Sequence, residues 1–211
     1  MPRSSALLFV LLLLLPLSAP AQTAAADSPA DPIEGPRVLL RTSMGDVTVQ
    51  LDPQRAPLTV ENFLRHAREG FYNGTVFHRV IENMLIQGGA FTVDLQARPN
   101  REPVPNEAAG TLSNLRGTLA AARAPGDADS HTTQFFINVV DNPRFDHRSS
   151  DDPYQAGYAV FGRVVAGMDL VDRIRAVETG ARPPLPRDVP VNPVLIERVD
   201  VLEPEDDDSD A

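Results

Sequence analysis

The feature that most constrains the fold is a series of short apolar runs separated by turns that contain glycine and proline. The runs occupy residues 38–40, 47–51, 76–81, 84–87, 117–122, 135–140, 157–165 and 194–202. Helical spacing of apolar side chains is confined to residues 59–69 and 168–177. Many short strands with two helices predict a closed or nearly closed antiparallel β-barrel whose ends the helices plug. A doubly wound α/β fold is the alternative, but it needs more helices between the strands.

Local signals indicate where these elements begin and end. Residues 43–46, with the sequence Ser-Met-Gly-Asp, separate the first two apolar runs and predict a hairpin. Thr59 is the expected N-cap of the first helix, and Gly70 is its expected stop. The second helix is expected to open on Asp169. A chain of 211 residues is long enough for one such domain with a sizeable core.

The composition excludes several classes of protein. The sequence contains no cysteine, which excludes disulfides, cysteine-ligated zinc and thiol nucleophiles. A formal net charge of −10 argues against binding to nucleic acid, because neutralising phosphates requires a basic face. We therefore expect no nucleic-acid partner.

Both ends of the chain differ from the part between them. Residues 1–21 combine Arg3, an apolar stretch and an Ala-Pro-Ala cleavage pattern, which predict a cleavable signal peptide of the Sec type. The stretch is too short to span a bilayer, so we expect no stable membrane insertion after cleavage. Residues 22–36 are typical of a flexible linker, and residues 203–211 of an acidic disordered tail. The domain over residues 37–202 is expected in the periplasm, with secretion as the alternative.

The common catalytic motifs are missing from the sequence. The 4 histidines are scattered without an HxxxH or HExxH pair, so we expect no metal site. His78, within an apolar run, is more typical of a hydrogen-bonded structural histidine than of a metal ligand. The sequence lacks the Lys-Ser/Thr pair of a phosphate-binding loop after Gly88-Gly89, and it has no GxSxG motif. These gaps argue against hydrolase and kinase chemistry.

Polar side chains stand out on three of the apolar runs. Arg79, Gln87 and Gln134 each lie in or beside such a run. By alternation Phe77 and Arg79 share one face of their strand, as do Gln134 and Phe136. These polar groups must find partners, because burying them unpaired is costly. Two interpretations stay open: a structural Arg–Gln network, or a surface groove with an apolar floor and one fixed guanidinium.

Three blocks of sequence carry a resemblance to a known family. They are FYNGTVFHRVIENMLIQGGAFT at residues 71–92, GTLAAARAPGDADSHTTQFFINVVDNPRFDH at residues 117–147 and GYAVFGRVVAGMDLVDRI at residues 157–174. In this order they resemble the cyclophilin-type peptidyl-prolyl cis-trans isomerases, and in particular the exported bacterial subgroup. The resemblance covers residues 37–202. It implies a mainly β fold, a closed eight-stranded antiparallel β-barrel capped by two α-helices, with a proline-binding groove on its outer face.

The resemblance also implies roles for individual residues. Arg79 matches the catalytic arginine, while Gln87 and Gln134 match glutamines that position the arginine and the peptide backbone. Residues at or beside the proline pocket are implied to bind substrate, namely Phe77, His78, Met84, Leu85, Ala122, Phe136, Phe145 and Tyr158. No metal and no cofactor is implied.

The implied reaction suits these side chains. Amide resonance gives rotation about the X–Pro bond a barrier of roughly 18–20 kcal/mol. Lowering it requires an apolar slot for the proline ring and a donor that favours the twisted prolyl nitrogen, without a nucleophile or a metal. A guanidinium oriented by Gln87 can be this donor. The expected partners are proline-containing unfolded or nascent exported polypeptides, and the expected state is a monomer.

Two positions depart from the family pattern at the expected pocket. Met84 replaces an aromatic residue, which keeps the apolar volume but loses an aromatic face. Arg144 stands where many members carry Trp or Phe, and Phe145 follows it. These departures support an alternative hypothesis, in which the domain is a holdase that binds proline-containing segments with little turnover.

Overall fold

The computed structural model describes residues 33–99 and 101–202. The elements follow in the order β1 (Arg37–Thr42), β2 (Gly45–Leu51), α1 (Pro57–Arg68), β3 (Thr75–Val76), β4 (Arg79–Ile81), β5 (Leu85–Gly88), η1 (Ala108–Gly110), β6 (Thr118–Ala121), β7 (Phe135–Asn138), η2 (Pro143–Phe145), β8 (Val160–Ala166), α2 (Met168–Arg175), β9 (Thr179–Arg182), β10 (Leu185–Pro190) and β11 (Leu195–Leu202). The predicted signal peptide, most of the predicted linker and the predicted acidic tail lie outside the described residues.

The last residues of the predicted linker pack onto the domain. Ile33 is buried, and the carbonyl oxygen of Pro36 accepts a hydrogen bond of 2.9 Å from the backbone amide of Leu51. The side-chain amide of Gln50 donates to the carbonyl oxygen of Gly35. These contacts attach residues 35–36 to β2.

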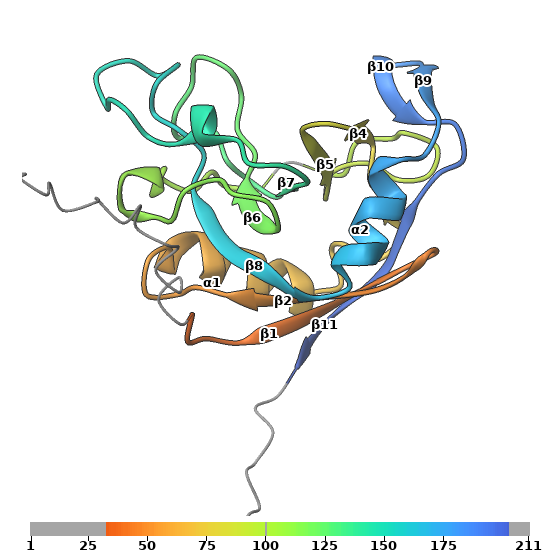
Figure 1. Cartoon of the computed structure of the whole chain (residues 1–211), viewed down its shortest axis with the longest axis horizontal. Coiled ribbons are helices and arrows are strands. Elements are labelled where there is room, and N and C mark those ends of the chain that lie inside the picture. The colour runs from red at the N-terminus through yellow and green to blue at the C-terminus, as the bar shows by residue number, and fades with distance from the viewer. Residues whose placement is uncertain (1–32, 100, 203–211) are drawn as a thin grey trace, which may run out of the picture. The chain divides into compact units, whose positions relative to one another are not determined.

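The strands form a strongly curled antiparallel sheet. Across the described ranges its nine strands run in the order β3-β11-β1-β2-β8-β6-β7-β5-β4, and Figure 1 shows them as a half-barrel. The two outermost strands of this order, β3 and β4, are consecutive parts of residues 75–81. Counting that segment once gives the eight strands expected. The mainly β fold is therefore confirmed, with the chain itself rather than a ladder of hydrogen bonds joining the two edges.

The two expected helices are confirmed, with shifted starts. In α1 the first residue is Pro57 and the N-cap is Ala56, so Thr59 is not the cap; its hydroxyl instead donates to a carboxylate oxygen of Glu107 at 2.6 Å. Gly70 follows the helix with a φ of 69°, a left-handed conformation that favours glycine and ends the helix. Within residues 33–99 and 101–202, no helix is long and apolar enough to span a bilayer.

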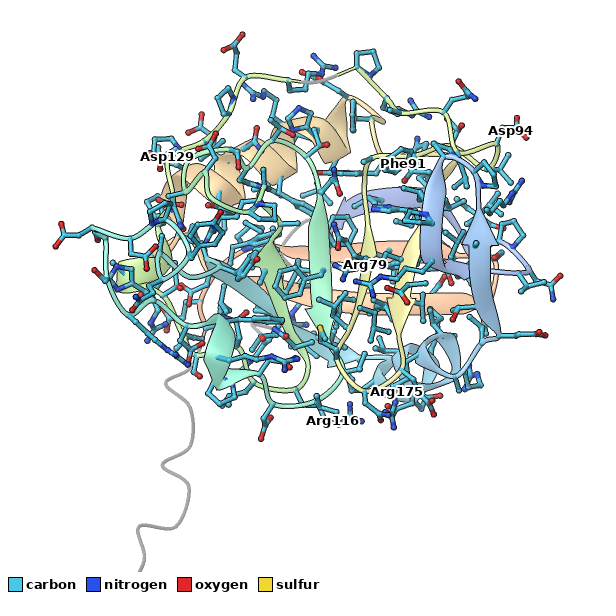
Figure 2. All side chains as sticks on the ribbon, turned by 90° about the horizontal axis from the view of Figure 1, so that it is seen from above. Arg79, Phe91, Asp94, Arg116, Asp129 and Arg175 are labelled. Atoms are coloured by element: carbon cyan, nitrogen blue, oxygen red, sulfur yellow. The ribbon has the colours of Figure 1, made fainter. Side chains whose placement is uncertain are left out.

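The curled sheet and both helices enclose one apolar core, here called the inner cluster. Its largest fully buried side chains include Phe63, Tyr72, Phe77, Phe135 and Phe161. The ring of Phe63 lies 5.0–5.5 Å from its aromatic neighbours, within the range of favourable ring pairs. Figures 1 and 2 place α1 and α2 at opposite ends of the sheet, where each buries one apolar face against this cluster.

The alternation of side chains shifts by one residue between β3 and β4. Phe77 and Val80 both belong to the inner cluster, although alternation alone would place them on opposite faces. His78 and Arg79 lie consecutively between them, on the outer side. Phe77 therefore does not share a face with Arg79, as the sequence predicted, because residues 77–78 belong to neither strand.

A second sheet, which no sequence pattern predicted, is the β9–β10 hairpin. It pairs antiparallel over Thr179–Arg182 and Leu185–Pro190 and lies beside β4 in Figure 1. Leu185 and Val189 attach the hairpin to an apolar cluster that also contains Val76 and Leu195. The hairpin is thus fixed beside the segment that carries Arg79.

Candidate active site

A chain of polar side chains crosses the outer face of the sheet. Arg79 on β4 is the register partner of Gln87 on β5. Its Nη1 donates a long hydrogen bond of 3.4 Å to Oε1 of Gln87, and Nε2 of Gln87 donates to Oε1 of Gln134 at 2.9 Å. The structure therefore brings together the arginine and both glutamines that the sequence singled out. Figure 2 shows Arg79 in the middle of this face.

An apolar cluster lies beside this polar chain, and we call it the outer cluster. Its buried members are Leu85, Ala120, Phe136 and Val160, and its partly buried members are Met84, Leu112, Ala122, Phe145 and Tyr158. The rings of Phe136, Phe145 and Tyr158 lie 5.2–5.8 Å apart in edge-to-face pairs. Since several members remain partly exposed, the cluster offers an apolar floor that is open to solvent.

Gln87 borders both the apolar floor and a polar hollow. It is the register partner of Phe136 on β7, which places it at the border of the outer cluster. It also lines a hollow of about 240 Å³, which adjoins the outer cluster at Ala122. The hollow is lined by Gln87, Ala122, Arg123, Ala124, Ser130, Thr132 and Gln134. A peptide bound across this face would therefore meet both an apolar slot and a polar depression.

Two of the predicted substrate-binding residues lie elsewhere. Phe77 is buried in the inner cluster and does not contact the outer one. His78 is also buried, with its ring 4.7 Å from that of Phe91. Burial lowers the pKa of His78 to about 4, while a hydrogen bond with Gln134 acts in the opposite direction. His78 is therefore neutral at neutral pH, and its side chain is almost completely buried.

The remaining predicted residues all belong to the outer cluster. Leu85 is the first residue of β5, Met84 directly precedes that strand, and Ala122 follows β6. Phe136 projects from β7, on the face opposite to Phe135, as the alternation predicted. Phe145 ends the short helix η2. Tyr158 completes the set just before β8.

Three charged residues that are not among the predicted site residues border the site. The guanidinium of Arg123 lies 4.8 Å from the ring centre of Tyr158, and that of exposed Arg144 lies 5.1 Å from the ring centre of Phe145. A carboxylate oxygen of Asp188 on β10 lies 3.7 Å from Nε of Arg79. No sequence signal pointed to Asp188, because it lies far along the chain from Arg79 in a proline-rich stretch.

The site has the means to bind and orient a peptide. No group of three or more His, Asp or Glu residues in the described part of the chain is arranged to hold a metal ion. What the geometry supplies is an apolar slot with a hydrogen-bond donor at its edge.

Comparison with known proteins identifies the family. The family described as cyclophilin type peptidyl-prolyl cis-trans isomerase matches residues 37–201. The chain belongs to this family. As a cyclophilin-type isomerase, it catalyses the cis-trans isomerisation of peptidyl-prolyl bonds.

Relatives and solved structures agree with this assignment. Peptidyl-prolyl cis-trans isomerase A of Dickeya dadantii is 46% identical over 165 residues, which cover 78% of this chain and 84% of the relative. Peptidyl-prolyl cis-trans isomerase B of Escherichia coli is 48% identical over 166 residues, covering 79% and 99%. A Cryptosporidium parvum cyclophilin crystallised in the presence of the dipeptide Ala-Pro shares the fold, with a TM-score of 0.63 at 22% identity over 79% of this chain and 99% of that one.

Proposed function

We propose that this cyclophilin-type isomerase lowers the barrier to X–Pro rotation with Arg79 as hydrogen-bond donor to the prolyl nitrogen. The observation that carries the proposal is the position of Arg79, held by Gln87 at the edge of the outer cluster. The proline ring would occupy the open apolar floor formed by Phe136, Phe145 and Tyr158. Its nitrogen would then lie toward the guanidinium.

The physical basis is stronger binding of the twisted amide than of the planar one. In the planar amide the nitrogen lone pair is delocalised into the carbonyl group, so the nitrogen accepts hydrogen bonds poorly. When the bond twists, the lone pair localises on nitrogen and becomes an acceptor. A donor fixed in place beforehand stabilises only this twisted state, which is the condition for rate acceleration. The guanidinium of an arginine is a suitable donor because it is planar and stays charged.

We further propose that the natural substrates are exported polypeptides and that the enzyme works in the periplasm as a monomer. The support is the signal-peptide pattern of residues 1–21. The lack of cysteine suits a compartment in which thiols are oxidised. Cell fractionation of the producing bacterium, with the enzyme followed by antibody, tests this location against release into the medium.

The decisive experiment on the mechanism is Arg79→Ala. Loss of one preorganised donor lowers catalysis by about 100-fold or more, so kcat/KM for a short proline peptide should fall by this amount. Arg173→Ala is the matched control, because Arg173 is an exposed arginine of α2 whose partner Asp169 lies on the same helix. A variant without Arg79 that retains near-full activity at an unchanged melting temperature would overturn the mechanism.

The holdase alternative is separated by measuring binding and turnover together. Exposed Arg144 and the thioether of Met84 are the features that motivate it. Calorimetry with a proline peptide reports binding, and a protease-coupled assay reports isomerisation. Binding without acceleration by the wild-type protein would favour the holdase.

A further inference from the structure

We propose that Asp188, from the β9–β10 hairpin, is a positioning residue for the guanidinium of Arg79. The inference rests on the proposed function of Arg79 and adds a residue from a separate sheet to the active site. It is carried by the ion pair between the two side chains, by the backbone of Asp188 and by the attachment of the hairpin.

The ion pair and the hydrogen bond to Gln87 hold the guanidinium at two of its three nitrogens. Oδ2 of Asp188 lies 3.7 Å from Nε, and Oε1 of Gln87 lies 3.4 Å from Nη1. A planar group that is contacted at two nitrogens is restrained more than one contacted at a single nitrogen, and its third nitrogen is left for another acceptor. Neither contact alone would fix the plane, because both are long.

The exposure of Arg79 explains why a second restraint matters. The side chain of Arg79 is 39% exposed, so solvent competes for its donors, and a flexible arginine would sample many rotamers. The Asp188 side chain is only 26% exposed and approaches from the side opposite to β5. In Figure 2 Arg79 lies between the blue β9–β10 hairpin and the green β7.

The backbone of Asp188 has an unusual conformation. Its φ is 63°, in the left-handed region that residues other than glycine rarely adopt, although Asp and Asn tolerate it best. Conformations of this kind are retained where the surroundings fix them, and they gather at functional sites. Here the conformation interrupts the regular pairing of β10 with β9 between Leu185 and Val189.

Apolar packing holds the β9–β10 hairpin, and with it the carboxylate of Asp188, in place. Val189, the residue after Asp188, is 3% exposed and packs in the apolar cluster with Val76 on β3 and Leu195 on β11. The carboxylate is therefore attached to the same segment that carries Arg79. Nε of Arg187 also lies 3.6 Å from Oδ2 of Asp188. The Arg187 side chain is 78% exposed, so this contact does not hold the carboxylate in place against Arg79.

The test uses two variants of the full-length enzyme that keep the unusual backbone. Asp188→Asn removes the charge while keeping the size and the tolerance of positive φ. Asp188→Gly removes the whole side chain and suits this φ even better. Arg187→Gln is the control, because it removes the exposed ion pair of the hairpin and leaves the contact with Arg79.

Both Asp188 variants should lower kcat/KM about three- to tenfold, with the loss in kcat rather than KM, because the orientation of Arg79 matters most in the twisted state. Arg187→Gln should change it less than twofold, and melting temperatures should be unchanged or, for Asp188→Gly, raised. The NMR signal of the Arg79 Nε–H should shift and exchange faster with water in both variants. In the double variant Arg79→Ala with Asp188→Asn, the loss should equal that of Arg79→Ala alone.

The outcomes separate this inference from the mechanism on which it rests. If Arg79→Ala abolishes turnover but both Asp188 variants match the wild type, Asp188 has no positioning role and the mechanism stands. If either Asp188 variant is faster than the wild type, the carboxylate restrains Arg79 unproductively and the inference is wrong. If Arg79→Ala is itself fully active, the mechanism fails before Asp188 is considered.

Discussion

Phe135 and Phe136 are neighbours on β7 and are both buried, yet they belong to two clusters with different tasks. Phe135 faces the inner cluster and is enclosed by Phe63, Tyr72 and Phe77. Phe136 faces the outer cluster, where its neighbours Phe145 and Tyr158 remain partly exposed. The inner cluster is enclosed on every side by sheet and helices, whereas the outer one is covered on one side only.

This difference shows how one strand serves stability and binding at once. Packing that is complete gives the largest stabilisation, because every buried atom has neighbours on all sides. Packing that is left open retains apolar surface for a ligand to cover. The alternation of a β-strand assigns the two tasks to alternate residues.

Phe135→Ala should destabilise the protein by about 3–5 kcal/mol, because it leaves a cavity among aromatic rings that cannot close it. The folded fraction should keep kcat/KM close to that of the wild type. Urea unfolding gives the free energy of unfolding, and activity per folded molecule is measured at 10 °C to limit unfolding. A large loss of activity without a loss of stability would show that the inner cluster takes part in binding.

Phe136→Ala should show the reverse balance. We expect kcat/KM to fall by at least about tenfold, since the proline ring loses its main apolar contact, each 1.36 kcal/mol being about tenfold. The loss of stability should be smaller than that of Phe135→Ala, because solvent or neighbouring side chains can fill an open site. Equal losses of stability in the two variants would contradict the division between the clusters.

Acid should lower the free energy of unfolding, because histidines are buried beneath the outer face of the sheet. Burial lowers the pKa of His131 to about 4, and its Nδ1 lies 3.1 Å from the carbonyl oxygen of Ala122, a member of the outer cluster. The charge of His66 lowers this pKa further, and that of Glu107 raises it. Since histidine in the unfolded chain titrates near pH 6.5, between about pH 6.5 and 4 only the unfolded state takes up the proton.

Stability should therefore be complete above about pH 6.5 and fall progressively toward pH 4, by on the order of 2 kcal/mol for His131. His131→Asn keeps a side-chain donor near the position of Nδ1 and removes the titration. Thermal unfolding from pH 7.5 to 4.5 should thus show a flatter dependence in the variant. Parallel curves for the two proteins would mean that His131 does not contribute.

Gln87→Ala should lower kcat/KM about three- to tenfold with little change in stability. The residue contacts both Arg79 and Gln134, and its loss frees the guanidinium while Asp188 still restrains one side. Steady-state kinetics and a melting curve measure the two quantities. Gln96→Ala, a change of an exposed glutamine between β5 and β6, is the control and should have no effect.

Removal of residues 203–211 is expected to have the smallest effect. The segment is strongly acidic and follows the last strand of the domain. Turnover of a short neutral peptide should be unchanged within error. A severalfold change would show that this acidic segment influences the site.

Much of the fold could be predicted because its signals are local. The hairpin at residues 43–46, the strands and both helices follow from alternation, helical spacing and glycine stops. The β9–β10 hairpin was missed because a proline-rich sequence with few apolar residues does not have the pattern of a strand. Phe77 was assigned to the wrong face because an irregular pair of residues between β3 and β4 cannot be recognised from alternation.

The candidate site was predicted from the family resemblance more than from pattern. Alternation placed Gln134 with Phe136 correctly, but it could not choose between a structural network and a groove. The structure brings the polar chain and the open outer cluster together, and this juxtaposition supports the groove. Asp188 could not have been found, because only the three-dimensional fold brings it near Arg79.

The strand pairing of the segment at residues 75–81 also bears on the order in which the domain is completed during synthesis. Its first part pairs with β11, the last strand, and the amide of Phe77 donates to the carbonyl oxygen of Val194. The first strand, β1, also pairs with β11. While the ribosome still holds residues 194–202, neither β1 nor the segment before Arg79 has this partner. The last strand to be synthesised is therefore the one that joins the first strand to the segment carrying Arg79.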